Sequence, residues 1–395
     1  MTLNFILFFG FLHSLMFLFY SLKKKNFINP LFIIFGLTFF TYFFFPVIYI
    51  IKYDTGHSFS YGLLATYILI FITHLTYLLV MLFYKVPRIK FLKIHHIKKN
   101  LFISLILGII FIVLVYYFIE IIHFQSINNL SPRDFYAQTR QSAGSSFIIS
   151  TLMFFLLIVV LLNFKSNFLK LIVLILLFYS SLYVGSKSII FTFTGIVLFY
   201  LSYKNNLRIN FVHIVIIGLI FIIFSFYNQN FTSKLLAFSL YSDYVWNSEY
   251  IINNINSYTY GSLFVEDNFY SRIPRFLYDS KPIFFGSSEL SMMVNEKQVL
   301  SMQGSPSLGY GKIYAEFGIF SFPLIFLVTL FNAFFLKLFS NSVKENLSIA
   351  HFILFLYFAK LPIIQVPPAW VLPEIIILSS IAYYIYKLRI GTYKK

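Results

Sequence analysis

Long apolar runs dominate this sequence and constrain its fold more than any other feature. Most of them approach or reach the roughly 20 residues that a helix needs to cross the hydrocarbon core of a bilayer. Eleven such segments are present, with approximate boundaries 2–22, 31–51, 61–84, 101–123, 147–162, 169–184, 189–203, 211–227, 311–337, 348–360 and 371–386. Because they are uninterrupted, they lack the alternation of a barrel strand. The sequence therefore predicts an all-α polytopic membrane protein of about 11 transmembrane helices (10–12), with 1–395 as a single integral membrane domain.

Composition excludes a water-soluble fold. Charged residues make up 11% of the chain, whereas an ordinary soluble domain has about 25%. The absence of cysteine excludes disulfides, thiolate nucleophiles and cysteine-ligated metals.

The placement of Lys and Arg predicts the orientation. Alternate short loops collect 19 of the 30 basic residues: Lys23, Lys24, Lys25, Lys85, Arg88, Lys90, Lys93, Lys98, Lys99, Lys165, Lys170, Lys204, Arg208, Lys337, Lys344, Lys387, Arg389, Lys394 and Lys395. The side with more basic loops faces the cytoplasm. We therefore expect the N-terminus outside and the C-terminus inside. Much of the net charge of +17 is then an orientation signal, and no nucleic-acid partner is expected.

Two loops on the opposite, extracytoplasmic side are long. They span 124–146 and 228–310 and carry acidic as well as basic residues, whereas the cytoplasmic loops contain a single carboxylate, Glu345. Loops of that length in a compact protein are usually functional. The sequence therefore predicts two functional extracytoplasmic loops.

The two long loops share a pattern, Pro-Arg-x-x-Tyr-x7-Gly. The first copy runs from Pro132 to Gly144 and the second from Pro274 to Gly286. One interpretation is a pair of proline-initiated turns closed by glycine. The other is two similar grips for two similar anions, because the planar guanidinium of arginine matches phosphate geometry. The anion-grip interpretation predicts that replacing an arginine harms activity more than replacing a glycine.

Further residues in and beside the two copies are candidates for substrate binding. They are Arg140, Arg272, Lys281, Tyr136, Tyr278, Gly144 and Gly286. For Tyr136 and Tyr278 two interpretations stay open, because a tyrosine ring stacks on a sugar or packs at the bilayer surface, where aromatic residues collect.

Two more features carry charge near the same face. Lys187 lies in a short outward turn, where it either extends to the interface or adds a cation at the mouth of the bundle. Lys312 and Glu316 stand four residues apart at the start of a long apolar helix. They are either a salt-bridged helical pair, or Glu316 is a base or a ligand of a sugar hydroxyl.

Motifs for metals and nucleotides are missing from the sequence. It contains no Walker loop, no H-E-x-x-H and no G-x-S-x-G, and the eight histidines are not at metal-ligand spacing with carboxylates. We therefore expect no metal site and no cofactor.

Taken together, the two Arg-x10-Gly motifs, the Gly185–Lys187 turn, the run from Arg272 to Gly286 and the segment from Tyr314 to Gly318 resemble O-antigen polymerases of the Wzy type. Members often have arginine in the Gly-Ser-basic turn, where this chain has Lys187. Lysine keeps the charge but loses the bidentate geometry.

The resemblance implies a polymerase in the bacterial inner membrane with a periplasmic active face. Its substrates are a donor and an acceptor glycan, both linked to undecaprenyl pyrophosphate, and a chain-length regulator protein is an expected partner besides membrane lipid. Arg275 and Arg133 are the expected catalytic cations that stabilise the leaving group. Glu316 is the expected catalytic carboxylate.

Two alternatives share part of this pattern. An O-antigen ligase, or another lipid-linked-sugar glycosyltransferase, has similar topology, but the ligase resemblance brings a histidine in the large outer loop and 228–310 contains none. A lipid-linked oligosaccharide flippase or other transporter places charges at mid-bilayer. Here the charges lie in the outer loops, which favours the polymerase.

Overall fold

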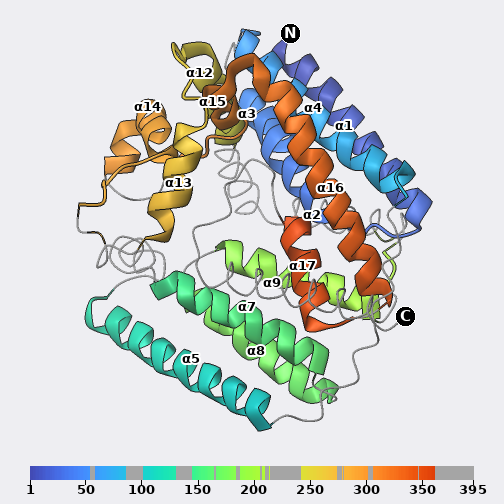
Figure 1. Ribbon diagram of the computed structural model, residues 1–395, viewed down its shortest axis with the longest axis vertical. Helices are drawn as coiled ribbons and strands as arrows, with labels where there is room; N and C mark the ends of the chain where they lie inside the picture. The colour runs from blue at the N-terminus through green and yellow to red at the C-terminus, as the bar shows by residue number, and fades with distance from the viewer. Residues whose placement is uncertain are drawn as a thin grey trace, which may run out of the picture. The chain divides into compact units, whose positions relative to one another are not determined.

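The protein is helical throughout the part that the structure describes. The computed structural model describes residues 1–53, 58–85, 101–129, 145–163, 166–183, 187–204, 207–209, 213, 242–273, 278, 280–300, 306–345 and 347–360. Its helices (Figure 1) are α1 Thr2–Lys24, α2 Phe32–Thr38, η1 Phe39–Phe44, α3 Phe45–Tyr53, α4 Tyr61–Phe83, α5 Leu101–Ile127, α7 Ser145–Asn163, α8 Asn167–Tyr183, α9 Lys187–Lys204, α12 Asp243–Asn254, α13 Ser262–Arg272, α14 Ser287–Leu300, α15 Gly311–Phe317, η4 Gly318–Phe320, α16 Ser321–Glu345 and α17 Ile349–Lys360.

Nine of the eleven predicted apolar segments coincide with these helices, and the other two, 211–227 and 371–386, lie outside the described residues. Four helical stretches are long and apolar enough to cross a membrane: Thr2–Lys24, Phe32–Tyr53, Tyr61–Phe83 and Gly311–Glu345. The all-helical prediction is confirmed for the described residues. The number of eleven spans stays a prediction.

The chain forms two compact units. The first comprises Met1–Val86, Arg208–Lys337 and Phe358–Ala369, and the second comprises Pro87–Leu207, Leu338–Tyr357 and Trp370–Lys395. In the second unit, Phe199 of α9 and Phe355 of α17 pack edge to face, with ring centroids 5.0 Å apart. Lys170, which the sequence places in a cytoplasmic loop, is buried within α8 and donates to the Tyr200 hydroxyl at 2.9 Å.

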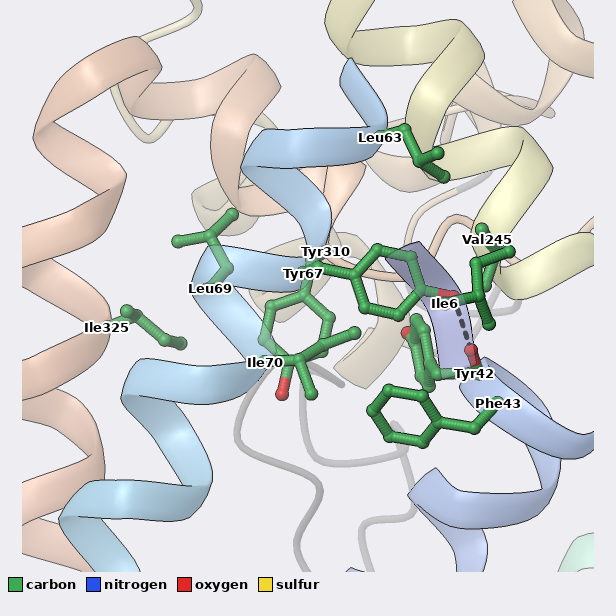
Figure 2. Packing of buried hydrophobic residues seen from close by; sticks show 10 residues of the cluster. All are labelled: Ile6, Tyr42, Phe43, Leu63, Tyr67, Leu69, Ile70, Val245, Tyr310 and Ile325. Carbon is green, nitrogen blue, oxygen red and sulfur yellow. Dashed lines mark hydrogen bonds between the residues drawn. The ribbon is translucent and has the colours of Figure 1, made fainter. Parts of the chain in front are cut away.

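An aromatic and aliphatic core holds the first unit together. Figure 2 shows its ten residues: Ile6, Tyr42, Phe43, Leu63, Tyr67, Leu69, Ile70, Val245, Tyr310 and Ile325. Their elements are far apart in the sequence, since α1, η1 and α4 meet α12 and α16 there. Between helices of membrane-spanning length, close packing of such side chains stabilises the bundle through van der Waals contacts, because lipid is as apolar as the core itself.

Several polar atoms inside these apolar helices find partners nearby, whereas both ring nitrogens of His13 and the Tyr77 hydroxyl are buried without a hydrogen-bond partner among the described residues. In α4, the hydroxyls of Thr66, Thr73 and Thr76 each donate to the carbonyl four residues earlier. Tyr42 lies in the π-helical turn η1, where the backbone departs from α-helical geometry. Its carbonyl accepts from the Tyr67 hydroxyl at 2.5 Å, the dashed line in Figure 2. Pairing of this kind lets polar groups lie in an apolar bundle.

A lysine joins α16 to the end of α4. The Lys337 ammonium donates to the carbonyls of Val80 at 2.8 Å and Met81 at 3.0 Å, and to that of Tyr84. Val80 and Met81 lie in the last turn of α4 and Tyr84 follows it, where helix carbonyls lack some of their usual partners; the Val80 carbonyl also accepts from the Tyr84 amide at 3.2 Å. Lys337 thus caps the C-terminal end of α4 from a neighbouring helix.

The predicted loop 228–310 is largely helical where the structure describes it. It contains α12, α13 and α14, and α15 follows directly. We call these four helices the α12–α15 segment. The predicted loop 124–146 is described only at its edges, where α5 continues to Ile127 and α7 begins at Ser145.

Candidate functional site

The α12–α15 segment is attached to the bundle by a close approach of α12 to α4. Gly62 permits this approach, because a Cβ atom there would lie 2.5 Å from the Glu249 carbonyl oxygen. The Gly62 amide donates to Asn253 Oδ1 at 2.8 Å, and the hydroxyls of Thr66 and Ser248 are 2.8 Å apart. The Ser60 hydroxyl also donates to the Glu249 carboxylate. The segment is therefore tied to the N-terminal turns of α4 by backbone and side-chain contacts.

Within the segment, each helix contributes a buried apolar residue to a small core. The core contains Ile251, Leu263, Leu290, Leu308 and Ala315. Figure 1 shows α12 and α15 together, with α13 and α14 beside them. This small core fixes the positions of the charged side chains around it.

Asp267 is the centre of a polar cluster. Its Oδ1 accepts from the Ser287 amide at 3.0 Å, its Oδ2 accepts from the Ser287 hydroxyl, and the Lys312 ammonium lies 2.5 Å from Oδ2. The side chains of Lys312 and Asp267 are 10% and 14% exposed, so the ion pair is largely withdrawn from solvent. Asp267 thereby joins α13 to the start of α14 and to α15.

Gly286, the glycine that ends the second Pro-Arg motif, lies against this cluster. Its φ is +54°, and a Cβ atom there would lie 2.4 Å from Asp267 Oδ1 and 2.7 Å from the Leu263 carbonyl oxygen. Its amide donates to Glu266 Oε2 at 2.9 Å. Only glycine suits both the backbone conformation and the space. At Gly286 the structure therefore supports the interpretation of the motif as a turn closed by glycine, and a severe effect of changing this glycine is expected whether or not Arg275 grips an anion.

Of the two interpretations of Lys312 and Glu316, the structure does not show the salt-bridged helical pair. Lys312 pairs with Asp267, which lies 45 residues earlier in the sequence. Glu316 is 2% exposed, and its Oε2 atom has no hydrogen-bond partner. The Lys312 ammonium pairs with the Asp267 carboxylate because α13, which carries Asp267, packs against α15.

The side chain of Glu316, a residue of α15, packs against the first turn of α13. Its carboxylate is beside the backbone N–H groups of Gly261 and Phe264, where a helix N-terminus favours negative charge. Oε2 is 4.0 Å from the position of a Cβ atom at Gly261. Gly261, which has no side chain, is therefore a direct neighbour of this carboxylate.

Lys281 closes the loop that carries the second arginine. Its ammonium donates to the Ile273 carbonyl at 3.0 Å and lies 5.2 Å from the centre of the Phe285 ring. The enclosed stretch contains Arg275, whose position lies outside the described residues. Tyr278 is exposed, and its ring is parallel to that of Tyr270 with centroids 6.3 Å apart. Lys281 therefore has a positioning role in the described loop.

Two exposed carboxylates of the segment have raised pKa values. Partial desolvation, together with the neighbouring Glu266 carboxylate, raises the pKa of Glu289 above its ordinary value. Partial desolvation alone raises the pKa of Asp243. The carboxylates in contact with Gly286 and Ser287 are those of Glu266 and Asp267, and the Lys312 ammonium pairs with Asp267.

The structure brings part of the predicted site together. Glu316 and Gly286 lie at the same cluster, on either side of the Asp267–Lys312 pair, and Lys281 and Tyr278 belong to the loop that leads into it. Arg272 ends α13 and Lys187 begins α9, and only their backbone is described. The predicted residues that lie outside the described ranges are Arg133, Tyr136, Arg140, Gly144 and Arg275.

Asp267 is the residue that the sequence interpretation missed. It carries no motif, and it was one of several carboxylates in the long loop. No spacing rule pairs it with Lys312, because the two residues lie 45 positions apart on different helices and meet only in the folded segment.

The fold and this cluster define a class of protein: a helical membrane protein with several helices of membrane-spanning length and a folded, charged segment attached to its bundle. Within that class, the sequence is similar to two curated proteins named O-antigen polymerase, from Salmonella typhimurium (strain LT2) and Salmonella typhi. Each is 30% identical over 261 residues, which are 64% of this chain and 64% of the relative. The match thus spans less than two thirds of either relative's length.

This similarity confirms the resemblance to O-antigen polymerases of the Wzy type that the motifs indicated. No protein-family model matches the sequence, and no solved structure matches it.

Proposed function

We propose that this chain is an O-antigen polymerase that joins oligosaccharide repeat units linked to undecaprenyl pyrophosphate. The observation that carries the proposal is the similarity to two O-antigen polymerases. The geometry of the α12–α15 segment supports it, because the second Pro-Arg motif ends at Gly286 in a fixed contact with Asp267 and leads to the buried Glu316.

The reaction joins two lipid-linked glycans. The acceptor hydroxyl oxygen forms a bond with the anomeric carbon of the donor glycan, while the bond from that carbon to the pyrophosphate oxygen breaks. The electron pair leaves with undecaprenyl pyrophosphate, and the hydroxyl proton passes to a base. Arg275 and Arg133 stabilise the charge on the leaving group, and Glu316 is the carboxylate placed to accept the proton.

The Glu316 carboxylate is buried, and Gly261, which has no side chain, is one of its neighbours. We propose that an acceptor hydroxyl approaches on the Gly261 side and supplies the hydrogen-bond partner that Oε2 lacks.

The proposed site faces the periplasm from the bacterial inner membrane. The basic loops support this orientation. Reporter fusions after Lys99 and Lys344 should signal cytoplasm, and fusions near Gln141 and Asn295 should signal the outside. A periplasmic signal from the fusion after Lys99 would contradict the orientation.

Deletion of the gene tests the function. A strain without this chain should make surface glycan of a single repeat unit, and the plasmid-borne wild-type chain should restore the ladder of long chains on a gel. Complete loss of surface glycan in the deletion strain would instead indicate a ligase or a flippase.

Independence of metals and nucleotides is part of the proposal, because the lipid pyrophosphate is already an activated leaving group. Purified protein with lipid-linked repeat units should elongate them in the presence of a chelator and without ATP. A strict requirement for added Mg²⁺ would contradict the assignment of charge stabilisation to arginine. A chain-length regulator protein is proposed as a partner and is not needed in this assay.

A further inference from the structure

Tyr260 occupies an unusual place in the fold. It lies in the turn between α12 and α13, where its φ is +50°, and its side chain is 76% exposed. Bulky residues seldom adopt this left-handed conformation, and strained backbone of this kind concentrates at functional sites. Burial does not explain the aromatic ring, because most of it is in contact with solvent or membrane surface.

The turn is held in place by the helix that carries Glu316. The Thr259 amide donates to the Ala315 carbonyl at 3.3 Å, and the Tyr260 amide donates to the Glu316 carbonyl at 2.8 Å. These two backbone bonds fix the turn along the last residues of α15. The position of the Tyr260 backbone, from which the ring projects, is therefore fixed by α15.

A second contact fixes the neighbouring tyrosine. The Tyr258 ring lies directly on Gly318, where a Cβ atom would be 2.4 Å from Tyr258 Cζ. Its centroid is 6.4 Å from that of Tyr260, with the planes at 82°, and 6.2 Å from that of Tyr314. The Tyr314 hydroxyl is in turn 3.0 Å from the hydroxyl of Tyr61.

Three of these rings are open to the surroundings. Tyr61, Tyr258 and Tyr260 are exposed, whereas Tyr314 is buried between them. We call the three exposed residues the tyrosine platform. It adjoins Gly261, a direct neighbour of the Glu316 carboxylate. The platform therefore combines rigid aromatic faces, phenolic hydroxyls and a nearby carboxylate with an unpartnered oxygen.

We propose that the tyrosine platform binds the terminal sugar ring of the acceptor glycan. A pyranose has an apolar face of C–H groups, which the negative face of an aromatic ring attracts, and hydroxyls at its edge that pair with phenols. Binding there places a hydroxyl of the same sugar beside Glu316, as the acceptor end requires. The inference rests on the proposed function and assigns a substrate subsite to it.

Replacement of Tyr260 by asparagine tests the platform. Asparagine adopts positive φ more readily than tyrosine, so Tyr260→Asn removes the ring and keeps the turn. Saturation-transfer NMR with the purified protein and free repeat-unit oligosaccharide, released from the surface glycan and without lipid, should show at least tenfold weaker binding. In the deletion strain, Tyr260→Asn should give shortened chains at an unchanged protein level.

Two variants serve as controls. Tyr260→Phe keeps the ring face and should bind and polymerise within about twofold of wild type, because a single exposed hydroxyl contributes little. Tyr53→Asn removes another exposed tyrosine, 45% exposed, from the end of α3 and should leave both readouts unchanged.

The outcomes separate this inference from the proposed function. If the wild-type chain fails to restore long chains, the polymerase proposal fails. If wild type restores them and Tyr260→Asn matches it in both binding and chain length, only the platform is overturned. A reduced protein level with unchanged oligosaccharide binding would assign Tyr260 to the bilayer surface and would also overturn the platform.

Discussion

The bundle of α1, α3 and α4 and the α12–α15 segment belong to one compact unit, yet they are stabilised differently. The bundle core is made of aromatic and aliphatic side chains, and its polar atoms pair mainly within or next to their own helices. The segment depends on contacts between its helices, above all the ion pair of Asp267 with Lys312 and the close packing of Gly286 against Asp267.

The bundle and the segment should therefore differ in how well they tolerate substitutions. An apolar core accepts changes that conserve volume. A withdrawn ion pair does not, because removal of one partner leaves the other charge without compensation. We therefore expect substitutions in the segment to have larger effects than substitutions of similar size in the bundle, and four predictions test this in descending order of effect.

Gly286→Ala should have the largest effect. The new methyl group meets Asp267 and Leu263 at a positive φ, so the change disturbs both the turn and the ion pair. We expect a loss of more than about 4 kcal/mol in the free energy of unfolding and no long glycan chains. Thermal unfolding in detergent and a glycan ladder measure this. Gly36→Ala is the matched control, since nothing lies within 4 Å of its Cβ position; equal damage from both variants would contradict the prediction.

Lys312→Met should come next. It leaves the Asp267 carboxylate withdrawn from water without its cation, which costs on the order of 3–5 kcal/mol. The double variant Asp267→Asn, Lys312→Met should recover most of that loss, because both charges are removed and the asparagine oxygen still accepts from the Ser287 amide. A double-mutant cycle of unfolding free energies measures the coupling. Additive losses would show that the pair contributes nothing of its own.

Arg275→Ala should abolish long chains with little effect on stability. Loss of one charge-stabilising contact lowers the rate by roughly 10²–10³-fold. Arg275→Lys should give shortened chains, because lysine keeps the charge and loses the fork. A ladder with an immunoblot for protein level separates activity from expression. A normal ladder from Arg275→Ala would refute the anion grip and make Arg272 the next residue to test.

Ile325→Val should have the smallest effect. Ile325 is fully buried in the bundle core, and removal of one methyl group costs about 0.5–1.5 kcal/mol. The ladder should stay normal, since the segment keeps all its contacts. A shift in chain length from this variant would show that the bundle and the segment are not independent in the way their contacts indicate.

The sequence predicted the bundle helices within a few residues, because a run of apolar side chains of membrane-spanning length has few alternatives in a bilayer. It did not predict α12, α13 and α14, which are short and polar and lack that signal. A signal was present in α12, whose buried residues Val245, Ser248, Ile251 and Ile252 recur at helical spacing.

The candidate site was predictable only in part. Glu316 and Gly286 were identified from motifs and lie at one cluster. The partner of Lys312 was not, because spacing along a helix reveals neighbours on that helix and not a carboxylate on another one. The left-handed Tyr260 was not predictable either, since its conformation opposes the local preference of the residue.

The capping of α4 by Lys337 limits how the protein can move. A slide of α16 along α4 by one helical turn, about 5.4 Å, would separate the ammonium from the carbonyls of Val80, Met81 and Tyr84 at once. The ammonium would lose all three acceptors in one step, and the carbonyls of Met81 and Tyr84 would lose a charged donor. Lys337 therefore opposes any sliding of α16 along α4.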